Sequence, residues 1–268
     1  MNKIEMLGVG IDNLAFQEAL RKVSDFLKEK KFHQLTVLNC ANFYQFSRDK
    51  IFKEIYKNSD LTIADSKFIV LVSRMLKKPL KEQIAGADLL GEILELAEEQ
   101  GCRVFLLKGS VAAKDLGAKG LLLKKFKSLK VAGIYYTFYD FNPEEDFQEN
   151  QRIVKAIQQA KPDILIVSLG SPKGTKWIWH NRSYLENISF CSEIGEAIDF
   201  VSGRVRRAPL WMQKLCLEWF FRLCLEPRRL WKRNTVNNSY FLWVLTKELF
   251  SSRIKQIKLL FWRRSSGR

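Results

Sequence analysis

Short, continuous runs of apolar residues alternate with longer amphipathic segments over the first 200 residues of the chain. The apolar runs are rich in β-branched residues, and uninterrupted runs of this length are typical of strands covered by helices on both faces. We therefore expect strands at Leu35–Asn39, Leu61–Ala64, Cys102–Lys108, Leu129–Gly133 and Asp163–Leu169, and a sixth with a weaker pattern at Ile188–Cys191.

The segments between these runs have helical length and spacing. We expect helices near 14–30, 43–58, 67–77, 87–100, 111–127, 146–161 and 173–186. Strands that alternate with helices in this way predict an α/β fold with a mostly parallel, Rossmann-like sheet flanked by helices.

The pattern changes after Gly203. Pro209 stands at the first turn of a predicted helix that Glu226-Pro227 should end, because proline cannot continue a helix. A second helical stretch is expected at about Tyr240–Trp262. The chain is thus predicted to consist of an α/β domain at 1–203 and a helical appendage at 204–268.

Charge separates the same two parts. The formal charge is +16 on 268 residues, but residues 1–200 carry 29 Lys+Arg against 26 Asp+Glu, whereas residues 201–268 carry 16 against 3. Five of the seven Trp also lie in the last part. Basic helices with Trp and Phe on the other face are typical of segments that lie in a membrane interface. The alternative is that these faces pack on the sheet or on another subunit.

Cysteine usage and the N-terminus indicate a cytoplasmic protein. The five cysteines show no CxxC spacing, and the first residues lack the basic and apolar regions of a secretory signal. No run of 18 uncharged apolar residues is present, so we expect a protein peripheral to a membrane and not a spanning one.

Polar and small residues directly follow the predicted strands. In parallel sheets, ligands collect beyond the carboxyl ends of the strands, which gives these positions functional weight. They are Asn39, Asp65-Ser66, Gly109-Ser110 and Gly170-Ser171-Pro172. The alternative is that Asn39 and Asp65 only cap the next helices and the glycines only turn the chain.

The sequence lacks the residues that several kinds of catalytic site require. With two histidines the chain cannot supply an HExxH zinc site or a histidine cluster, and a Ser-His-Asp triad is hard to build. The run GSPKGTK at 170–176 lacks the spacing of a phosphate loop, and no DxD pair exists to hold a metal against a nucleotide diphosphate. We therefore expect no metal site and no cofactor, with phosphate charge stabilised by Arg, Lys or backbone N–H groups.

The segment GEAIDFVSGRVRRAPLWMQKLCLEWFFRLCLEPRRLWKR resembles the C-terminal signature of the TagA/WecG/CpsF family of bacterial glycosyltransferases, especially in RAP-x-W-M, L-E-W-x-x-R-L and E-P-x-R. Upstream, MLGVGIDNLAFQEAL, TIADSKFIV, AGADLL, FLLKGS and DILIVSLGSPKGTKW follow in the order of that family's other blocks. The resemblance covers about residues 5 to 235.

The resemblance implies an inverting, metal-independent transferase on the inner face of the bacterial cell membrane. Such an enzyme moves a sugar, often of N-acetylmannosamine type, from a UDP-sugar to an undecaprenyl-diphosphate-linked acceptor. Family products feed wall teichoic acid, enterobacterial common antigen, or capsular and exopolysaccharide. The proposed general base of the family falls on Asp65.

By motif position, the resemblance assigns three arginines to the leaving diphosphate: Arg207, Arg222 and Arg229. The other residues implied to shape the substrate pocket are Asn39, Ser66, Gly86, Asp88, Gly109, Gly170, Pro172 and Lys173. The arginines have an alternative role, which is to bind lipid phosphates or pair with Glu218 and Glu226. With arginines on a membrane-docking segment, docking is expected to complete the active site.

The chain also departs from the family pattern. The usual A-D-G-x-G reads Ala64–Phe68 as ADSKF, the usual P-K-Q-E reads Pro172–Thr175 as PKGT, and an arginine that often precedes the A-G-x-D-L block appears as Gln83. An altered donor or acceptor preference is one consequence. The alternative is a catalytically weakened scaffold of a polysaccharide assembly complex. A nucleic-acid partner is disfavoured because no reading motif accompanies the basic residues, and homo-oligomerisation is left open.

Overall fold

The computed structural model describes residues 3–109, 118–138, 141–142, 145–194, 197–203, 205–215 and 217–250, without the side chains at 118, 210, 214, 229 and 232–234. Within this part, six strands form one parallel sheet. Their order across the sheet is β4 (Leu61–Ala64), β3 (His33–Leu38), β8 (Phe190–Ser192), β7 (Ile164–Ser168), β5 (Arg103–Gly109) and β6 (Lys130–Thr137). All six predicted strands and the α/β class are confirmed.

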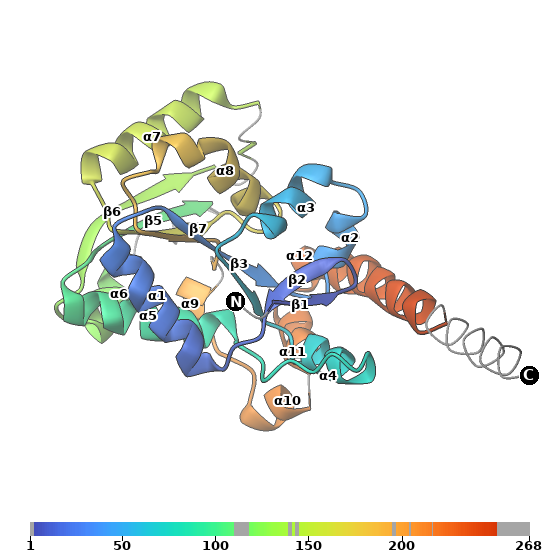
Figure 1. The fold of residues 1–268 in the computed structure, drawn as a ribbon. Coiled ribbons are helices and arrows are strands. Elements are labelled where there is room, and N and C mark those ends of the chain that lie inside the picture. The colour runs from blue at the N-terminus through green and yellow to red at the C-terminus, as the bar shows by residue number, and fades with distance from the viewer. Residues whose placement is uncertain are drawn as a thin grey trace, which may run out of the picture.

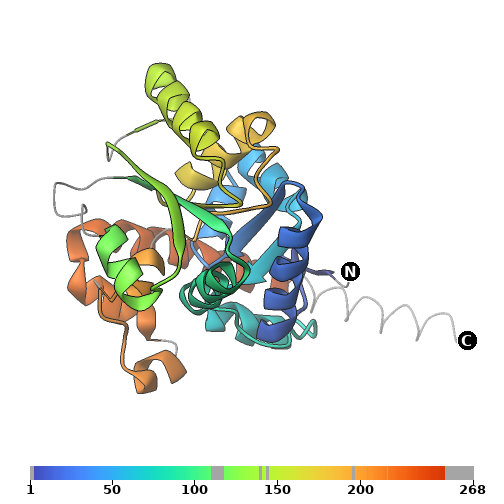
Figure 2. The same cartoon turned by 90° about the vertical axis from the view of Figure 1, so that its left-hand side faces the viewer.

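Helices cover both faces of the sheet (Figure 1). One face carries α1 (Phe16–Glu29), α5 (Gly86–Gln100), α6 (Ala118–Lys125) and α9 (Ala197–Val201), and the other carries α7 (Phe147–Ala160) and α8 (Lys173–Asn181). Figure 2 shows the same separation from the side of β6. On β5, Val104 and Leu106 pack toward the first face and Phe105 and Leu107 toward the second. Because both faces are covered, successive residues of the strand must all be apolar.

A hairpin that the apolar pattern does not predict precedes α1. Its strands are β1 (Lys3–Met6) and β2 (Val9–Asp12), joined through Leu7 and Gly8 at φ of 52° and 80°. A two-residue turn with both residues at positive φ suits the twist of a hairpin, and leucine rarely takes the first of these places. The Asp12 Oδ2 atom accepts a 2.8 Å hydrogen bond from the Thr62 amide, which joins the hairpin to β4.

Three predicted helices differ in extent. The helix expected at 43–58 divides into α2 (Asn42–Phe46) and α3 (Lys50–Lys57), because the Asp49 carboxylate caps α3 by accepting from the Phe52 amide at 3.0 Å. The helix expected at 173–186 ends as α8 at Asn181 and continues as a 3₁₀ turn, Arg182–Tyr184. Residues 111–117 of the helix expected at 111–127 lie outside the described residues. Helix α4 (Lys67–Met75) follows its prediction.

The C-terminal segment contains more helices than predicted. The single helix expected from Pro209 is wrong, since α10 (Leu210–Lys214) and α11 (Glu218–Leu225) are separate. Pro227 ends α11 as expected but also begins α12 (Pro227–Lys232), and a π-helical stretch, Arg233–Asn237, leads into a helix at 238–250. Proline is well tolerated in a first helical turn.

The helix at 238–250 packs against the body of the protein. Phe241 is 1% exposed, and its ring centroid lies 4.8 Å from that of Phe43 and 5.8 Å from that of Phe68. Leu245 is buried in the same cluster. The division into parts at 1–203 and 204–268 stays a prediction. In the described part of the chain, no helix has the length and apolar character needed to cross a membrane.

Candidate active site

Asp65 and Asn39 lie side by side at the carboxyl edge of the sheet. The register pairs Leu38 with Ala64, so the residues that follow β3 and β4 stand level, and the Asp65 amide donates to the Leu38 carbonyl at 2.9 Å. The Asp65 carboxylate does not cap the helix that follows it. Its Oδ1 atom accepts a 2.7 Å hydrogen bond from the Gly86 amide, and Ser66 takes the N-cap position of α4.

Burial raises the pKa of the Asp65 carboxyl above its ordinary value of 3.8. The hydrogen bond from Gly86 opposes this, the charge of Glu218 adds to it, and the charges of Arg222 and Arg207 lower the pKa again. A carboxylate with a raised pKa is a stronger base, which is what proton abstraction near neutral pH requires.

Two of the three predicted arginines therefore lie within electrostatic reach of Asp65. The Arg207 Nε atom is 3.2 Å from Glu218 Oε1, and its Nη1 atom bonds to Asp88 Oδ1, so Arg207 links the first turn of α5 to α11. The pairing of a predicted arginine with Glu218, which was the alternative role given above, is thus observed for Arg207. The guanidinium carbon of Arg222 lies 5.2 Å from the centroid of the Phe200 ring. The side chain of Arg229 lies outside the described part.

Hydrogen bonds link the loops that follow β3 and β7. The Asn39 Oδ1 atom accepts from the Ala41 amide at 3.0 Å, and the Asn39 amide donates to Asn42 Oδ1 at 2.7 Å. Asn42 Nδ2 in turn donates to Ser171 Oγ at 3.2 Å. Gly170, before Ser171, takes φ of +78°, a conformation that favours glycine.

The remaining predicted residues surround the same edge. Pro172 and Lys173 begin α8, and Ser66 Oγ lies 3.5 Å from Cys40 Sγ. Gly109 ends β5, which β3, β8 and β7 separate from β4, so Gly109 and Asp65 stand at opposite sides of the site.

A family model described as "Glycosyl transferase WecG/TagA/CpsF family" matches residues 4–255. The chain belongs to this family. The resemblance stated above is thereby confirmed, and the protein is a glycosyltransferase.

Two relatives carry the name N-acetylglucosaminyldiphosphoundecaprenol N-acetyl-beta-D-mannosaminyltransferase. The protein of Bacillus subtilis (strain 168) is 35% identical over 226 residues, covering 83% of each chain. That of Staphylococcus aureus (strain MRSA252) is 25% identical over 241 residues, covering 87% of this chain and 89% of its own.

The departures from the family pattern take ordinary conformations in this member of the WecG/TagA/CpsF family. Ser66, where the pattern has glycine, lies at φ −94° and ψ 125°, so its side chain causes no backbone strain. Gln83, where the pattern often has arginine, donates from Nε2 to the Asp65 carbonyl at 2.6 Å. Ser66 thus adds no backbone strain beside the proposed base, and Gln83 hydrogen-bonds to the main chain of Asp65.

The structure also reveals polar groups at this edge that the sequence analysis missed. Lys108, 2% exposed near the end of β5, places Nζ 2.9 Å from Asp199 Oδ1 of α9. Glu193 follows the central strand β8 and accepts a hydrogen bond through Oε2 from Thr175 Oγ1 of α8. Lys108 could have been noticed in the sequence, because it is a charged residue within an otherwise apolar run. Glu193 was harder to find, because it follows the strand with the weakest sequence pattern.

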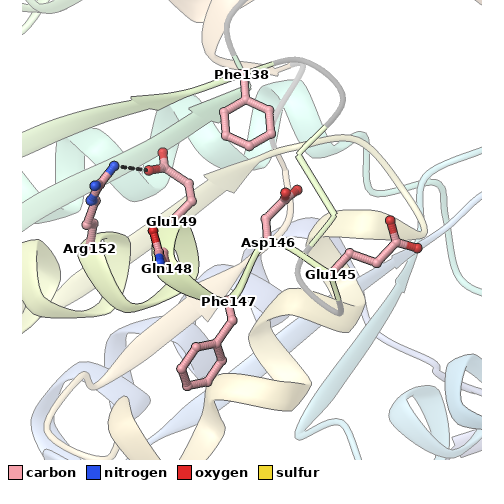
Figure 3. A pocket seen from close by; sticks show the side chains of 7 residues that line it. All are labelled: Phe138, Glu145, Asp146, Phe147, Gln148, Glu149 and Arg152. Atoms are coloured by element: carbon pink, nitrogen blue, oxygen red, sulfur yellow. Dashed lines mark ion pairs between the residues drawn. The ribbon is translucent and has the colours of Figure 1, made fainter.

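A cavity of about 440 Å³ lies elsewhere, beyond the end of β6 at the start of α7 (Figure 3). Glu149 in its wall accepts hydrogen bonds from Thr137 Oγ1 at 3.0 Å and Tyr135 Oη at 3.3 Å and pairs with Arg152 at 3.7 Å. Because β6 and β4 are opposite edge strands, this cavity is separate from the site around Asp65. No metal-binding group of three or more His, Cys, Asp and Glu residues occurs among those described.

Proposed function

We propose that this glycosyltransferase moves N-acetylmannosamine from UDP-N-acetylmannosamine to N-acetylglucosaminyl-diphosphoundecaprenol, with inversion at the anomeric carbon. The names of the relatives support the choice of sugar and acceptor, and the UDP-sugar donor is what the resemblance to the family implies. The observation that carries the proposal is the placement of Asp65, a carboxylate with a raised pKa, within reach of the charges of Arg207 and Arg222.

In the proposed reaction, Asp65 removes the proton from the attacking hydroxyl of the acceptor. The hydroxyl oxygen forms a bond to the anomeric carbon while the bond from that carbon to the diphosphate breaks, and UDP leaves with the electron pair. Fixed guanidinium groups stabilise such developing charge without rearranging. We assign this role to Arg207 and Arg222, and by motif position to Arg229, because the sequence lacks a DxD pair.

We further propose that the protein works at the inner face of the bacterial membrane, on a pathway to teichoic acid or another surface polysaccharide. Support comes from the exposed aromatic residues after residue 203. Exposed fractions are 59% for Trp211, 47% for Trp219, 55% for Trp231 and 55% for Trp243. Exposed tryptophans on a basic segment favour an anionic lipid surface.

Transfer of radiolabelled sugar from UDP-N-acetylmannosamine to a short-chain N-acetylglucosaminyl-diphosphoprenol tests the proposal. The wild-type protein should form a product with a β-linked sugar, and UDP-N-acetylglucosamine should be a poor donor. The absence of transfer from any UDP-N-acetylhexosamine, with the protein folded and bound to vesicles, would instead support the scaffold.

A further inference from the structure

The central strand of the sheet stops short of its neighbours. Strand β8 ends at Ser192, which stands level with Leu35 of β3 and Ile166 of β7. Its neighbours continue to Leu38 and Ser168. The hydrogen bond from Asn42 to Ser171 joins the loops of these two strands. The ladder of hydrogen bonds therefore ends earlier at β8 than at the strands on either side, and we call this gap in the ladder between β3 and β7 the notch.

Glu193 is the first residue beyond β8 and lies at the base of this notch. Its side chain is half-buried, and the Thr175 hydroxyl of α8 donates to its Oε2 atom. Gly174 permits this approach, because a Cβ atom there would lie only 2.7 Å from Glu193 Cγ. The packing of α8 thus fixes the position of the carboxylate.

The segment that follows β8 lies next to the site around Asp65. Ile194, next to Glu193, has its Cγ2 atom 3.1 Å from where a Cβ of Gly86 would be, and Asp65 Oδ1 is 3.6 Å from the same point. Tyr56, buried beneath, donates from its hydroxyl to the Val37 carbonyl at 2.8 Å. Burial raises the pKa of this phenol, and the charges of Glu193 and Asp65 add to the rise.

Gly174 and Thr175 are the two positions where the family pattern has an amide and a carboxylate. In this chain these two positions of α8 carry neither group, and the carboxylate of Glu193, directly after β8, accepts a hydrogen bond from Thr175 instead. A half-buried carboxylate fixed in a notch beside the proposed base is well placed to accept hydrogen bonds from a substrate.

We propose that Glu193 binds the donor sugar and contributes to its selection, by accepting hydrogen bonds from ring hydroxyls or the acetamido N–H group. This inference rests on the proposed function for the identity of the donor. Asp65 remains the base, and Glu193 contacts the sugar without taking part in proton transfer.

The replacement Glu193→Gln tests the inference, because the amide oxygen still accepts from Thr175 while the charge is lost. Hydrogen bonds to charged groups are worth enough to change affinity by about 10- to 100-fold. We expect Glu193→Gln to raise KM and the calorimetric Kd for UDP-N-acetylmannosamine by about tenfold or more, with kcat changed less than about threefold. The Kd for UDP, which has no sugar, should be unchanged. The exposed Glu186→Gln is the matched control.

A second variant, Thr175→Val, leaves the carboxylate but removes its anchor, and should raise the same KM by a smaller factor. An unchanged Kd for UDP-N-acetylmannosamine in Glu193→Gln, or an equal weakening of UDP and the UDP-sugar, would overturn the inference. If the wild type binds the UDP-sugar but transfers nothing, the proposed function fails while these binding constants still decide the role of Glu193. Wild-type protein that binds neither nucleotide would refute both.

Discussion

The Oδ1 atom of Asp65 accepts a hydrogen bond of 2.7 Å from the backbone amide of Gly86, which ties the end of β4 to the first turn of α5. The donor is a main-chain group, so substitutions of neighbouring side chains leave it in place. Gly86 is itself confined, because an added Cβ would lie 3.1 Å from Ile194 Cγ2. The proposed base is therefore oriented by the fold, and a change at Asp65 tests its chemistry.

Replacing Asp65 by asparagine should abolish most transfer without unfolding the protein. The asparagine Oδ1 can still accept from Gly86, but the amide cannot take a proton from the acceptor. General-base catalysis contributes about 10²- to 10⁴-fold, so kcat should fall by that range. Initial rates with saturating donor and acceptor measure the loss, and Asp25→Asn, at an exposed position on α1, is the control. A variant that retains more than half of wild-type kcat would exclude Asp65 as the base.

The pH profile of transfer should report the raised pKa of Asp65. The ionised form is the active base, so activity falls as the pH drops through this pKa, and the midpoint of the acid limb should lie above 3.8. Removing the negative charge in Glu218→Gln should move the limb to lower pH, and removing the positive charge in Arg222→Ala should move it to higher pH. Profiles of kcat/KM measure both shifts. Glu95→Gln on the exposed face of α5 should leave the limb where it is.

The ion pair between Lys108 and Asp199 should affect stability mainly because both side chains are largely shielded from water. Removing one member would leave the other charge without this partner. Lys108→Met leaves the Asp199 carboxylate, which is 21% exposed, without this cation, and removal of one member of a buried pair costs about 3 kcal/mol. Urea unfolding should show this loss. Adding Asp199→Asn should recover part of it, whereas the exposed Lys119→Met should cost little. A double mutant as unstable as the sum of the single mutants would show that the pair is not coupled.

The exposed aromatic residues of α11 should control binding to membranes. Trp219 and Phe220 are 47% and 46% exposed, and replacing both by serine should reduce the partition coefficient onto phosphatidylglycerol-containing vesicles by about tenfold or more. Co-sedimentation measures the change, and added salt should weaken the remaining binding. Tyr184→Ser removes an equally exposed aromatic ring beyond α8 and should have no effect. Equal sedimentation of both variants would place the membrane contact elsewhere.

The sequence was sufficient to predict the sheet because most of its strands are buried on both faces and so read as unbroken apolar runs. The hairpin was missed because its turn uses Leu7 at positive φ, where an Asn or Gly would have signalled it. The positions of Asp65 and Asn39 followed from strand ends alone. Glu193 could not be found in this way, because its importance depends on how far β8 stops short of β3 and β7, which is a property of the register.

Phe241 is buried among Phe43 and Phe68, so core packing holds the helix that carries the exposed Trp243. A helix joined to the rest of the protein only by a flexible linker could change its distance and angle relative to the sheet. A helix packed into the core keeps one distance and one orientation relative to the sheet. If the tryptophans contact the membrane as proposed, the fold sets a fixed distance between the bilayer and Asp65, and we expect an acceptor in the bilayer to reach Asp65 only when its reactive sugar projects by that distance.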